Sequence, residues 1–332
     1  MAIIVDLLIG LVLLVVPACT TLKTSGVISV KYGYADRTGK LVINPQFDDA
    51  RDFSGGLACV KIGEWGYIDR SGRFAINPRF GFADSFSDGL ARVKMGGKYG
   101  YIDRTGKVVI NPTFDEAYSF SDGLAQVEIG GKTGYVDKLG KIVINPQFDK
   151  GGPFRGGLAR VQVGSTWGFI SKAGKIVINP QFDDCGDFAE GYARVKVGGK
   201  WGFADKAGKI PINPQFDQAE SFSDGMALVE IDGRYGYVDR AGKIAVNPQF
   251  GEGKNFSEGL APVKIGSQWG FANKTGKIVV NPQFDDADIF SEGLARVKIG
   301  GRWGYVDKGG KYIINPQFEN AWTFSDGLAR MF

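Results

Sequence analysis

Carboxylates beside glycine recur along this 332-residue chain, and they are the first side chains whose placement could do chemistry. Asp285 and Asp286 follow a Phe, and Asp122 lies in a Phe-Ser-Asp-Gly segment. Oxygen ligands near glycine are typical of Ca²⁺ loops, but no Asp-x-Asp-x-Asp-Gly run with a distal Glu occurs. Asp and Ser before Gly are also ordinary turn formers. We therefore predict turns at these positions, and neither a metal site nor a cofactor.

Arginine recurs at one position of a repeated Gly-Leu-Ala-x-Val segment, where Cys59, Gln126, Leu228 and Pro262 stand in the other copies. Arginines in register could form a basic rim or line a channel that binds an anionic group. The alternative is a solvated strand face, which commonly carries such residues. As candidate ligand contacts we name Arg92, Arg160, Arg194, Arg296 and Arg330.

Aromatic residues fall into two groups. One group precedes a glycine in a repeated aromatic–Gly pair, and Tyr or once Thr replaces Trp there, so we expect partly buried packing rather than ligand stacking. Its tryptophans are Trp65, Trp167, Trp201, Trp269 and Trp303. The other group is Tyr118 and Trp322, which occupy a position that elsewhere holds mostly polar or small residues. An aromatic side chain on an exposed column indicates a contact site, so both are candidate ligand contacts.

Catalysis needs side chains that break the repeat, such as a nucleophile with a base or paired carboxylates in a pocket. The chain has no histidine, and therefore lacks the commonest general base and metal ligand. Cys59 and Cys185 replace the usual residues of their columns without forming a disulfide or metal pattern. We therefore expect a protein that is not an enzyme. The alternative is a carbohydrate-active enzyme with a β-propeller fold, which would need acidic residues from several blades to converge near the central axis of the propeller.

Residues 1–26 differ from the rest of the chain. Leu7 to Ala18 form an apolar run of a length typical of a signal peptide, and it ends at Cys19 before a small polar spacer. This segment resembles a bacterial lipoprotein signal, which implies lipidation of Cys19. The first residues contain Asp6 and no Lys or Arg, which is a departure from that pattern. Ordinary export, an uncleaved anchor, or an apolar tail on a misassigned start remain alternatives.

Residues 27–332 are built from a unit of about 34 residues. An Asn-Pro pair marks it nine times, from Asn44 to Asn315, and we assign its prolines, such as Pro78, Pro112 and Pro146, to the structure of the repeat. Within a unit, apolar and polar residues alternate with a period of two, and glycine pairs mark tight turns. We predict three strands followed by a short fourth, outer segment. Pro316 should end the third strand or lie at a sheet edge.

These units resemble the WG repeat, also called KWG, of many bacterial proteins. The resemblance rests on the aromatic–Gly pair, the D-[KR]-x-G-K turn, the [IV]-x-P-x-F segment and the F-[SA]-x-G-L-A return. It covers residues 27–332 in nine copies. It implies a β-repeat domain that acts in binding, often on secreted or surface proteins. It supplies no catalytic residues to carry over.

A closed β-propeller and an open β-solenoid both fit a short all-β unit. The first unit lacks its Gly-Leu-Ala-x-Val strand, and the last copy of that strand, Gly327 to Phe332, has no aromatic–Gly partner. The C-terminal strand could therefore complete the first blade. We predict closure, although a unit of about 34 residues is short for a blade. Nine blades also exceeds the usual four to eight.

Forty basic and 36 acidic residues are interleaved, and the net charge is +4, so no basic tract indicates nucleic-acid binding. We expect an exported, monomeric binding or scaffold protein of the cell envelope, with a protein or polysaccharide partner. Contact with a membrane would be only through an N-terminal lipid anchor. The protein would be secreted if the cysteine is not lipidated, and cytoplasmic if the leader is not a signal. A structural spacer is the further alternative.

Overall fold

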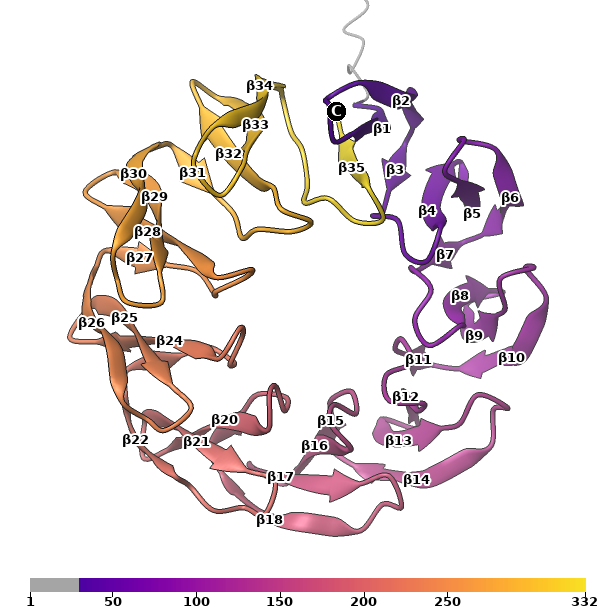
Figure 1. Ribbon diagram of the computed structural model, residues 1–332. Coiled ribbons are helices and arrows are strands. Elements are labelled where there is room, and N and C mark those ends of the chain that lie inside the picture. Colours follow the sequence, from indigo (N-terminus) through magenta and orange to yellow (C-terminus); the bar gives the residue numbers. More distant parts are fainter. Residues whose placement is uncertain (1–29) are drawn as a thin grey trace, which may run out of the picture.

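The computed structural model describes residues 30–332, and every regular element among them is a β-strand. The strands form nine small antiparallel sheets that surround one axis as the blades of a propeller (Figure 1). The predicted all-β, nine-bladed closed ring is therefore confirmed, and the solenoid alternative is wrong. The predicted leader and Cys19 lie outside the described residues.

We number the blades in chain order, beginning with the sheet that joins the two ends of the described chain. The innermost strands have two residues each and serve blades 2 to 9: β3 (Asp49–Ala50), β7 (Phe82–Ala83), β11 (Glu116–Ala117), β15 (Lys150–Gly151), β19 (Asp184–Cys185), β23 (Gln218–Ala219), β27 (Glu252–Gly253) and β31 (Asp286–Ala287).

The second strands, in blades 1 to 9, are β35 (Leu328–Met331), β4 (Leu57–Ile62), β8 (Ala91–Met95), β12 (Ala125–Ile129), β16 (Leu158–Val163), β20 (Tyr192–Val197), β24 (Met226–Ile231), β28 (Leu260–Ile265) and β32 (Ala295–Ile299). The third strands, in the same order, are β1 (Tyr32–Asp36), β5 (Glu64–Asp69), β9 (Lys98–Ile102), β13 (Lys132–Val136), β17 (Thr166–Ser171), β21 (Lys200–Asp205), β25 (Arg234–Asp239), β29 (Gln268–Asn273) and β33 (Arg302–Val306).

The outermost strands lie on the circumference of the ring in Figure 1. They are β2 (Leu41–Phe47), β6 (Phe74–Phe80), β10 (Val108–Phe114), β14 (Ile142–Phe148), β18 (Ile176–Phe182), β22 (Ile212–Phe216), β26 (Ile244–Phe250), β30 (Ile278–Phe284) and β34 (Tyr312–Phe318).

The prediction of a fourth, outer segment is wrong in its placement. The segment after the Asn-Pro strand does not extend its own blade outward; instead it begins the next blade as the innermost strand. Asp286 of β31 pairs with Lys298 of β32, for example, and β32 follows it in the chain. Pro316 does not end a strand, because β34 continues through it to Phe318. It does lie at a sheet edge, because β34 is outermost in its sheet.

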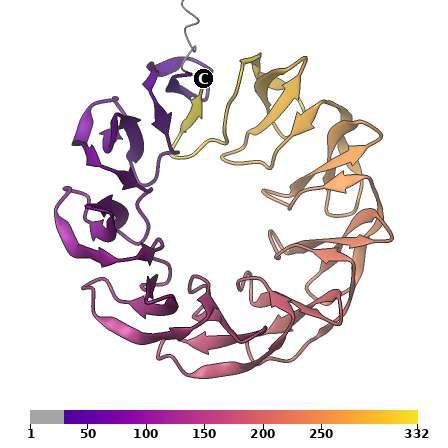
Figure 2. The ribbon, with the colours of Figure 1, turned by 180° about the vertical axis from the view of Figure 1, so that it is seen from behind.

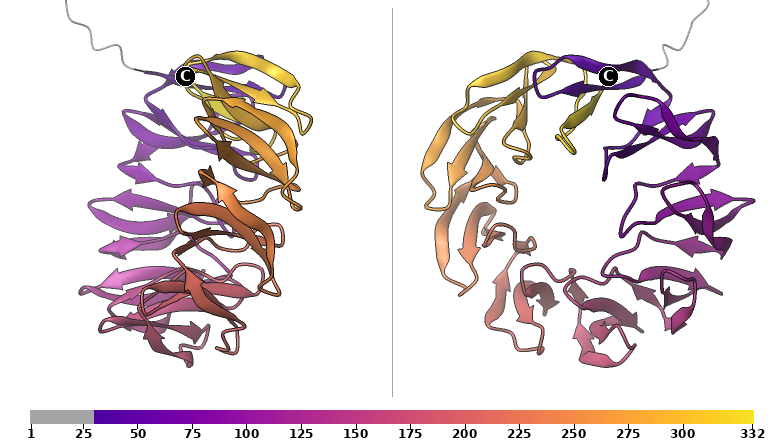
Figure 3. Two further views of the ribbon diagram at one scale, coloured as in Figure 1. Left: turned by 90° about the vertical axis from the view of Figure 1, so that its left-hand side faces the viewer. Right: turned by 45° about the vertical axis from the view of Figure 1, so that its right-hand side comes forward.

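The ring closes in the way predicted from its incomplete first and last repeats. β35 pairs with β1 in antiparallel register from Gly33↔Met331 to Asp36↔Leu328. The C-terminal strand lies beside the N-terminal strands in the view from behind (Figure 2) and in the two further views (Figure 3). An isolated bridge between Ala321 and Met331 stands in for the innermost strand of blade 1. One sheet therefore contains both ends of the described chain.

The glycine of the aromatic–Gly pair is required by a close backbone approach. A Cβ placed on Gly304 would lie 2.6 Å from the carbonyl oxygen of Ile314 and 2.6 Å from the nitrogen of Pro316. The register between β33 and β34 also shifts beside this glycine. The Asn-Pro segment therefore bulges over the glycine, which explains why these two markers recur together.

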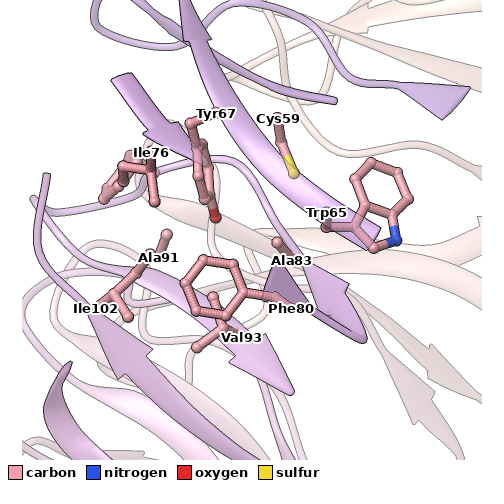
Figure 4. Close-up of a cluster of buried hydrophobic side chains, with 10 residues drawn as sticks. Cys59, Trp65, Tyr67, Ile76, Phe80, Ala83, Ala91, Val93 and Ile102 are labelled. Atoms are coloured by element: carbon pink, nitrogen blue, oxygen red, sulfur yellow. The ribbon is translucent and has the colours of Figure 1, made fainter. Parts of the chain in front are cut away.

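The core lies between the blades rather than within one of them. In Figure 4, Tyr67, Ile76 and Phe80 of blade 2 pack against Val93 and Ile102 of blade 3. The Tyr67 hydroxyl donates a 2.7 Å hydrogen bond to the carbonyl of Asp84, so its buried polar atom is satisfied. Each blade thus buries both of its faces, one against each neighbour.

Candidate functional site

The five arginines named as candidate ligand contacts occupy one position of the repeat, which we call the arginine column. All five lie at interfaces between blades. The side chains of Arg92, Arg296 and Arg330 are only 15%, 19% and 15% exposed. Each arginine donates from Nη1 to a backbone carbonyl on the innermost segment of the next blade; the acceptors of Arg92, Arg160, Arg194, Arg296 and Arg330 are Ala117, Cys185, Ala219, Ala321 and Ala50. The column is therefore not a freely solvated strand face.

An aromatic ring and a carboxylate complete each arginine site. The guanidinium carbon of Arg296 lies 4.6 Å from the centre of the Trp303 ring, and its Nη2 lies 2.9 Å from Asp288. Arg194 lies 4.9 Å from the Trp201 ring, and Arg160 lies 5.3 Å from the Trp167 ring. A guanidinium over a ring is favourable by roughly 0.5–2 kcal/mol. Trp65, Trp201, Trp269 and Trp303 are buried, and Trp167 is half-buried.

Two further cations at the blade interfaces were missed by the sequence reasoning. In blade 8 the column holds Pro262, and Lys254 supplies a cation from the inner segment. Its Nζ donates to the carbonyl of Ala287 at 2.6 Å and lies 5.2 Å from the Trp269 ring. In blade 2 the column holds Cys59, and Arg51 lies 5.4 Å from the Trp65 ring. Both compensating residues precede the column by eight positions, a spacing visible in the sequence once the inner segment is known to pair with it.

Tyr118 and Trp322 lie in blades 4 and 1, so the structure does not bring them together. Tyr118 is 41% exposed, and its hydroxyl lies 3.4 Å from Glu128. Trp322 is half-buried. Its ring centre is 4.0 Å from the Arg330 guanidinium carbon, and it also contacts Phe332. Trp322 thus completes an arginine site at the seam of the ring.

The recurring Asp and Glu of the Phe-Ser-Asp-Gly hairpins do more than form turns. Asp88 has a φ of 53°. This left-handed backbone conformation costs a residue that has a Cβ about 1 kcal/mol. The carboxylate of Asp88 accepts a 2.7 Å hydrogen bond from the Gly123 nitrogen of the next blade. Seven such carboxylates bridge neighbouring blades, namely Asp88, Asp122, Glu190, Asp224, Glu258, Glu292 and Asp326. The interblade bond offsets the backbone strain.

This belt of carboxylates is interrupted where Gly55 and Gly156 replace the acid. At the second interruption, between blades 5 and 6, Arg155 also replaces the serine that precedes the acid in most copies. A pocket of about 560 Å³ lies there, which we call the Arg155 pocket. Arg155, Arg160 and Arg194 line it, as do Asp122 and Asp187. Asp187 pairs with Arg155 at 3.8 Å and with Arg160 at 2.8 Å. Two of the sequence-predicted arginines thus meet in one basic pocket.

A second recess interrupts the arginine sites between blades 7 and 8, and we call it the Leu228 cleft. Its volume is about 520 Å³, and its lining includes Leu228, Tyr235 and three carboxylates, those of Glu220, Glu230 and Glu252. Lys254 also lines it, with its Nζ bonded to the Ala287 carbonyl of blade 9. Leu228 stands in the arginine column, and Gly253 replaces the alanine that usually follows on the next blade. A Cβ on Gly253 would lie 2.8 Å from Leu228 Cδ1, so the two replacements fit each other.

No group of His, Cys, Asp or Glu within residues 30–332 is arranged to hold a metal ion. In the same part of the chain no helix is long and apolar enough to cross a membrane. Cys59 and Cys185 are free and buried. Burial raises the pKa of the Cys185 thiol to about 12, which keeps it in the unreactive thiol form.

One solved structure of low sequence identity supports the fold, and that comparison concerns the fold alone. A eukaryotic initiation factor matches with a TM-score of 0.59 and 10% sequence identity, over 86% of this chain and 95% of that one. BamB from Moraxella catarrhalis matches with a TM-score of 0.37 and 11% identity, over 85% and 89% of the two chains. A comparison with curated proteins found no match.

The WG containing repeat matches nine consecutive segments of the chain: residues 32–64, 65–99, 99–132, 134–167, 167–201, 201–235, 235–269, 269–303 and 303–331. Each matched segment spans the two outer strands of one blade and the inner segment and second strand of the next, so the nine segments cover the whole ring. This protein belongs to the WG containing repeat family.

Proposed function

We propose that this chain is a non-catalytic binding or scaffold protein that presents its β-propeller to a protein or polymer partner at the cell envelope. One observation carries the proposal. The repeated arginines and hairpin carboxylates are engaged in holding the blades together, whereas two recesses of opposite charge occur where the repeat is interrupted. Small numbers of such departures on a rigid ring are typical of binding surfaces rather than of structural spacers.

The two recesses offer different contacts. The Arg155 pocket presents guanidinium groups, which suit a carboxylate, phosphate or acidic polymer. The Leu228 cleft presents carboxylates and a tyrosine ring, which suit a cationic group. Glu220 and Glu252 have side chains that are 51% and 54% exposed, so a ligand can reach them.

Affinity capture tests the proposal. The purified propeller would be immobilised, offered an envelope extract and a glycan array, and each captured molecule would be titrated against the free propeller. We expect a partner that binds the propeller directly and binds less well when Arg155 or Glu252 is neutralised. Turnover of a polysaccharide that disappears in Glu220→Gln or Glu230→Gln, without any such partner, would instead support the carbohydrate-active enzyme.

The envelope location depends on the leader and is tested separately. Wild-type protein should incorporate radiolabelled palmitate in a bacterial host, and Cys19→Ala should not. Equal labelling of the two would contradict the lipid anchor while leaving the binding function open to the capture experiment. The propeller itself is proposed to act as a monomer.

A further inference from the structure

The interfaces between blades contain an internal binding site for a cation, and its parts recur around the ring. An aromatic ring from the aromatic–Gly pair forms one wall. A carbonyl on the innermost segment of the next blade accepts a hydrogen bond from the cation in six interfaces, five times from arginine and once from Lys254. A carboxylate lies nearby, as Asp288 does beside Arg296. These interfaces therefore show repeatedly that a ring, a carbonyl and a carboxylate in this arrangement bind an arginine or lysine side chain.

Blade 7 keeps the walls of this site and loses both of its cations. In blade 6, Arg194 and Lys196 lie over Trp201, at 4.9 and 5.7 Å from the ring. The corresponding residues of blade 7 are Leu228 and Glu230; Glu230 pairs with Tyr235, and all three residues line the cleft. Leu228 has no donor to offer to the carbonyl of Gly253. The result is a cleft beside the buried Leu228 side chain, in place of an interface that an arginine bridges.

The charge of the Leu228 cleft is also reversed. Replacing arginine by leucine and lysine by glutamate removes positive charge and adds negative charge beside the ring. Glu220 and Glu252 line the same cleft, and the one cation among its lining residues, Lys254, is bonded to the Ala287 carbonyl of blade 9. The partners of the two glutamates are Arg194 at 3.5 Å and Lys264 at 2.7 Å. Both pairs are partly exposed, and such pairs are weak. Burial raises the pKa of the Tyr235 hydroxyl, as do the carboxylates of Glu230, Glu252 and Glu220.

We propose that the Leu228 cleft binds an arginine side chain presented by a partner protein, which takes the place of the arginine that blade 7 lacks. Arginine is favoured over lysine because its planar guanidinium can stack on the Tyr235 ring while it donates to the Gly253 carbonyl and to a carboxylate. Five of the filled interfaces use arginine in this way. The inference rests on the proposed function as a binding protein and names the chemistry of its partner.

A matched pair of peptides tests the inference. One is a blocked five-residue peptide with a single central arginine, and the other carries citrulline, a neutral isostere, at the same place. Isothermal titration at low ionic strength should show 1:1 binding of the arginine peptide, and binding of the citrulline peptide weaker by at least about tenfold. Equal affinities, or no binding of the arginine peptide, would overturn the inference.

The second part of the test fills the cleft with a side chain of the protein itself. Leu228→Arg restores the residue that five other blades carry, so the variant should fold, with a melting temperature no lower than that of wild type. Its own guanidinium should occupy the cleft and weaken binding of the arginine peptide at least about tenfold. The matched control is Gln126→Arg, which introduces arginine at the equivalent position of blade 4 and should leave the affinity unchanged.

Unchanged binding in Leu228→Arg would overturn the inference, as would an equal loss in Gln126→Arg. Failure of this inference remains distinct from failure of the proposed function. The capture experiment can still identify a partner that binds through the Arg155 pocket or another surface, whereas absence of any partner there would count against the binding function itself.

Discussion

Replacing Arg296 by methionine removes a guanidinium from one interface between blades and keeps most of the side-chain volume. In the structure this group donates to the carbonyl of Ala321 on blade 1, lies 2.9 Å from Asp288, and lies 4.6 Å from the centre of the Trp303 ring. The side chain of Arg296 is 19% exposed, so solvent compensates only partly for lost contacts.

The size of the effect follows from these three contacts. A hydrogen bond from a charged donor contributes about 1.5–3 kcal/mol, and the cation–ring contact contributes roughly 0.5–2 kcal/mol. Asp288 keeps a second cation, Lys254 at 3.7 Å, so it is not left without a partner. Methionine recovers part of the loss by packing on the ring. We expect the free energy of unfolding to fall by about 2–4 kcal/mol.

Urea unfolding followed by far-UV circular dichroism measures this loss. The matched control is Arg302→Met, because Arg302 is 52% exposed and its pair with Glu319 is 3.5 Å long. Exposed pairs contribute about 0–1 kcal/mol, so this control should change little. A loss below about 1 kcal/mol in Arg296→Met, or equal losses in the two variants, would refute the view that these arginines hold the blades together.

Gly304→Ala should destabilise the ring by about 1–3 kcal/mol in the same assay, because its Cβ would meet the backbone of the adjacent strand, whereas Gly309→Ala should be nearly neutral. Equal effects would contradict the close-approach argument. Gly156→Asp should be more stable than Gly156→Ala by about 2 kcal/mol, because only the aspartate can accept the Gly191 N–H of the next blade; no difference would contradict that bridge. A hydrogen bond from a lysine of the next blade lowers the pKa of Asp224 below 3.8. Its contribution to stability is therefore present above that pH and lost as pH falls through the folded-state pKa, and Asp224→Asn should flatten this decline. An unchanged acid profile would count against the pairing.

The repeat, the closure and the strand content could be predicted from the sequence because each depends on local signals. The Asn-Pro and aromatic–Gly markers give the period, and the unpaired Gly327 to Phe332 strand indicates how the ring closes. The innermost strands could not be placed, because two residues are too few to show a period. Only the observed pairing, such as Asp286 with Lys298, assigns that segment to the following blade.

The arginine column could be identified from the sequence, but its position between the blades could not. Alternation of apolar and polar residues usually indicates one buried and one solvated face, yet a propeller blade packs against a neighbour on both faces. Arg92 and Arg330 therefore lie in interfaces although they occupy the polar positions of their strands. The Leu228 cleft depends on which residues of two blades meet, and the period alone does not reveal that contact.

Small-angle X-ray scattering of the purified protein tests the central claim, closure into a nine-bladed ring, most directly. A compact chain of this length has a radius of gyration of about 20 Å, and a closed ring should lie at or slightly above that value. Its scattering should show low density along the central axis. A radius well above this range with the profile of a cylinder would contradict closure and would support an open rod.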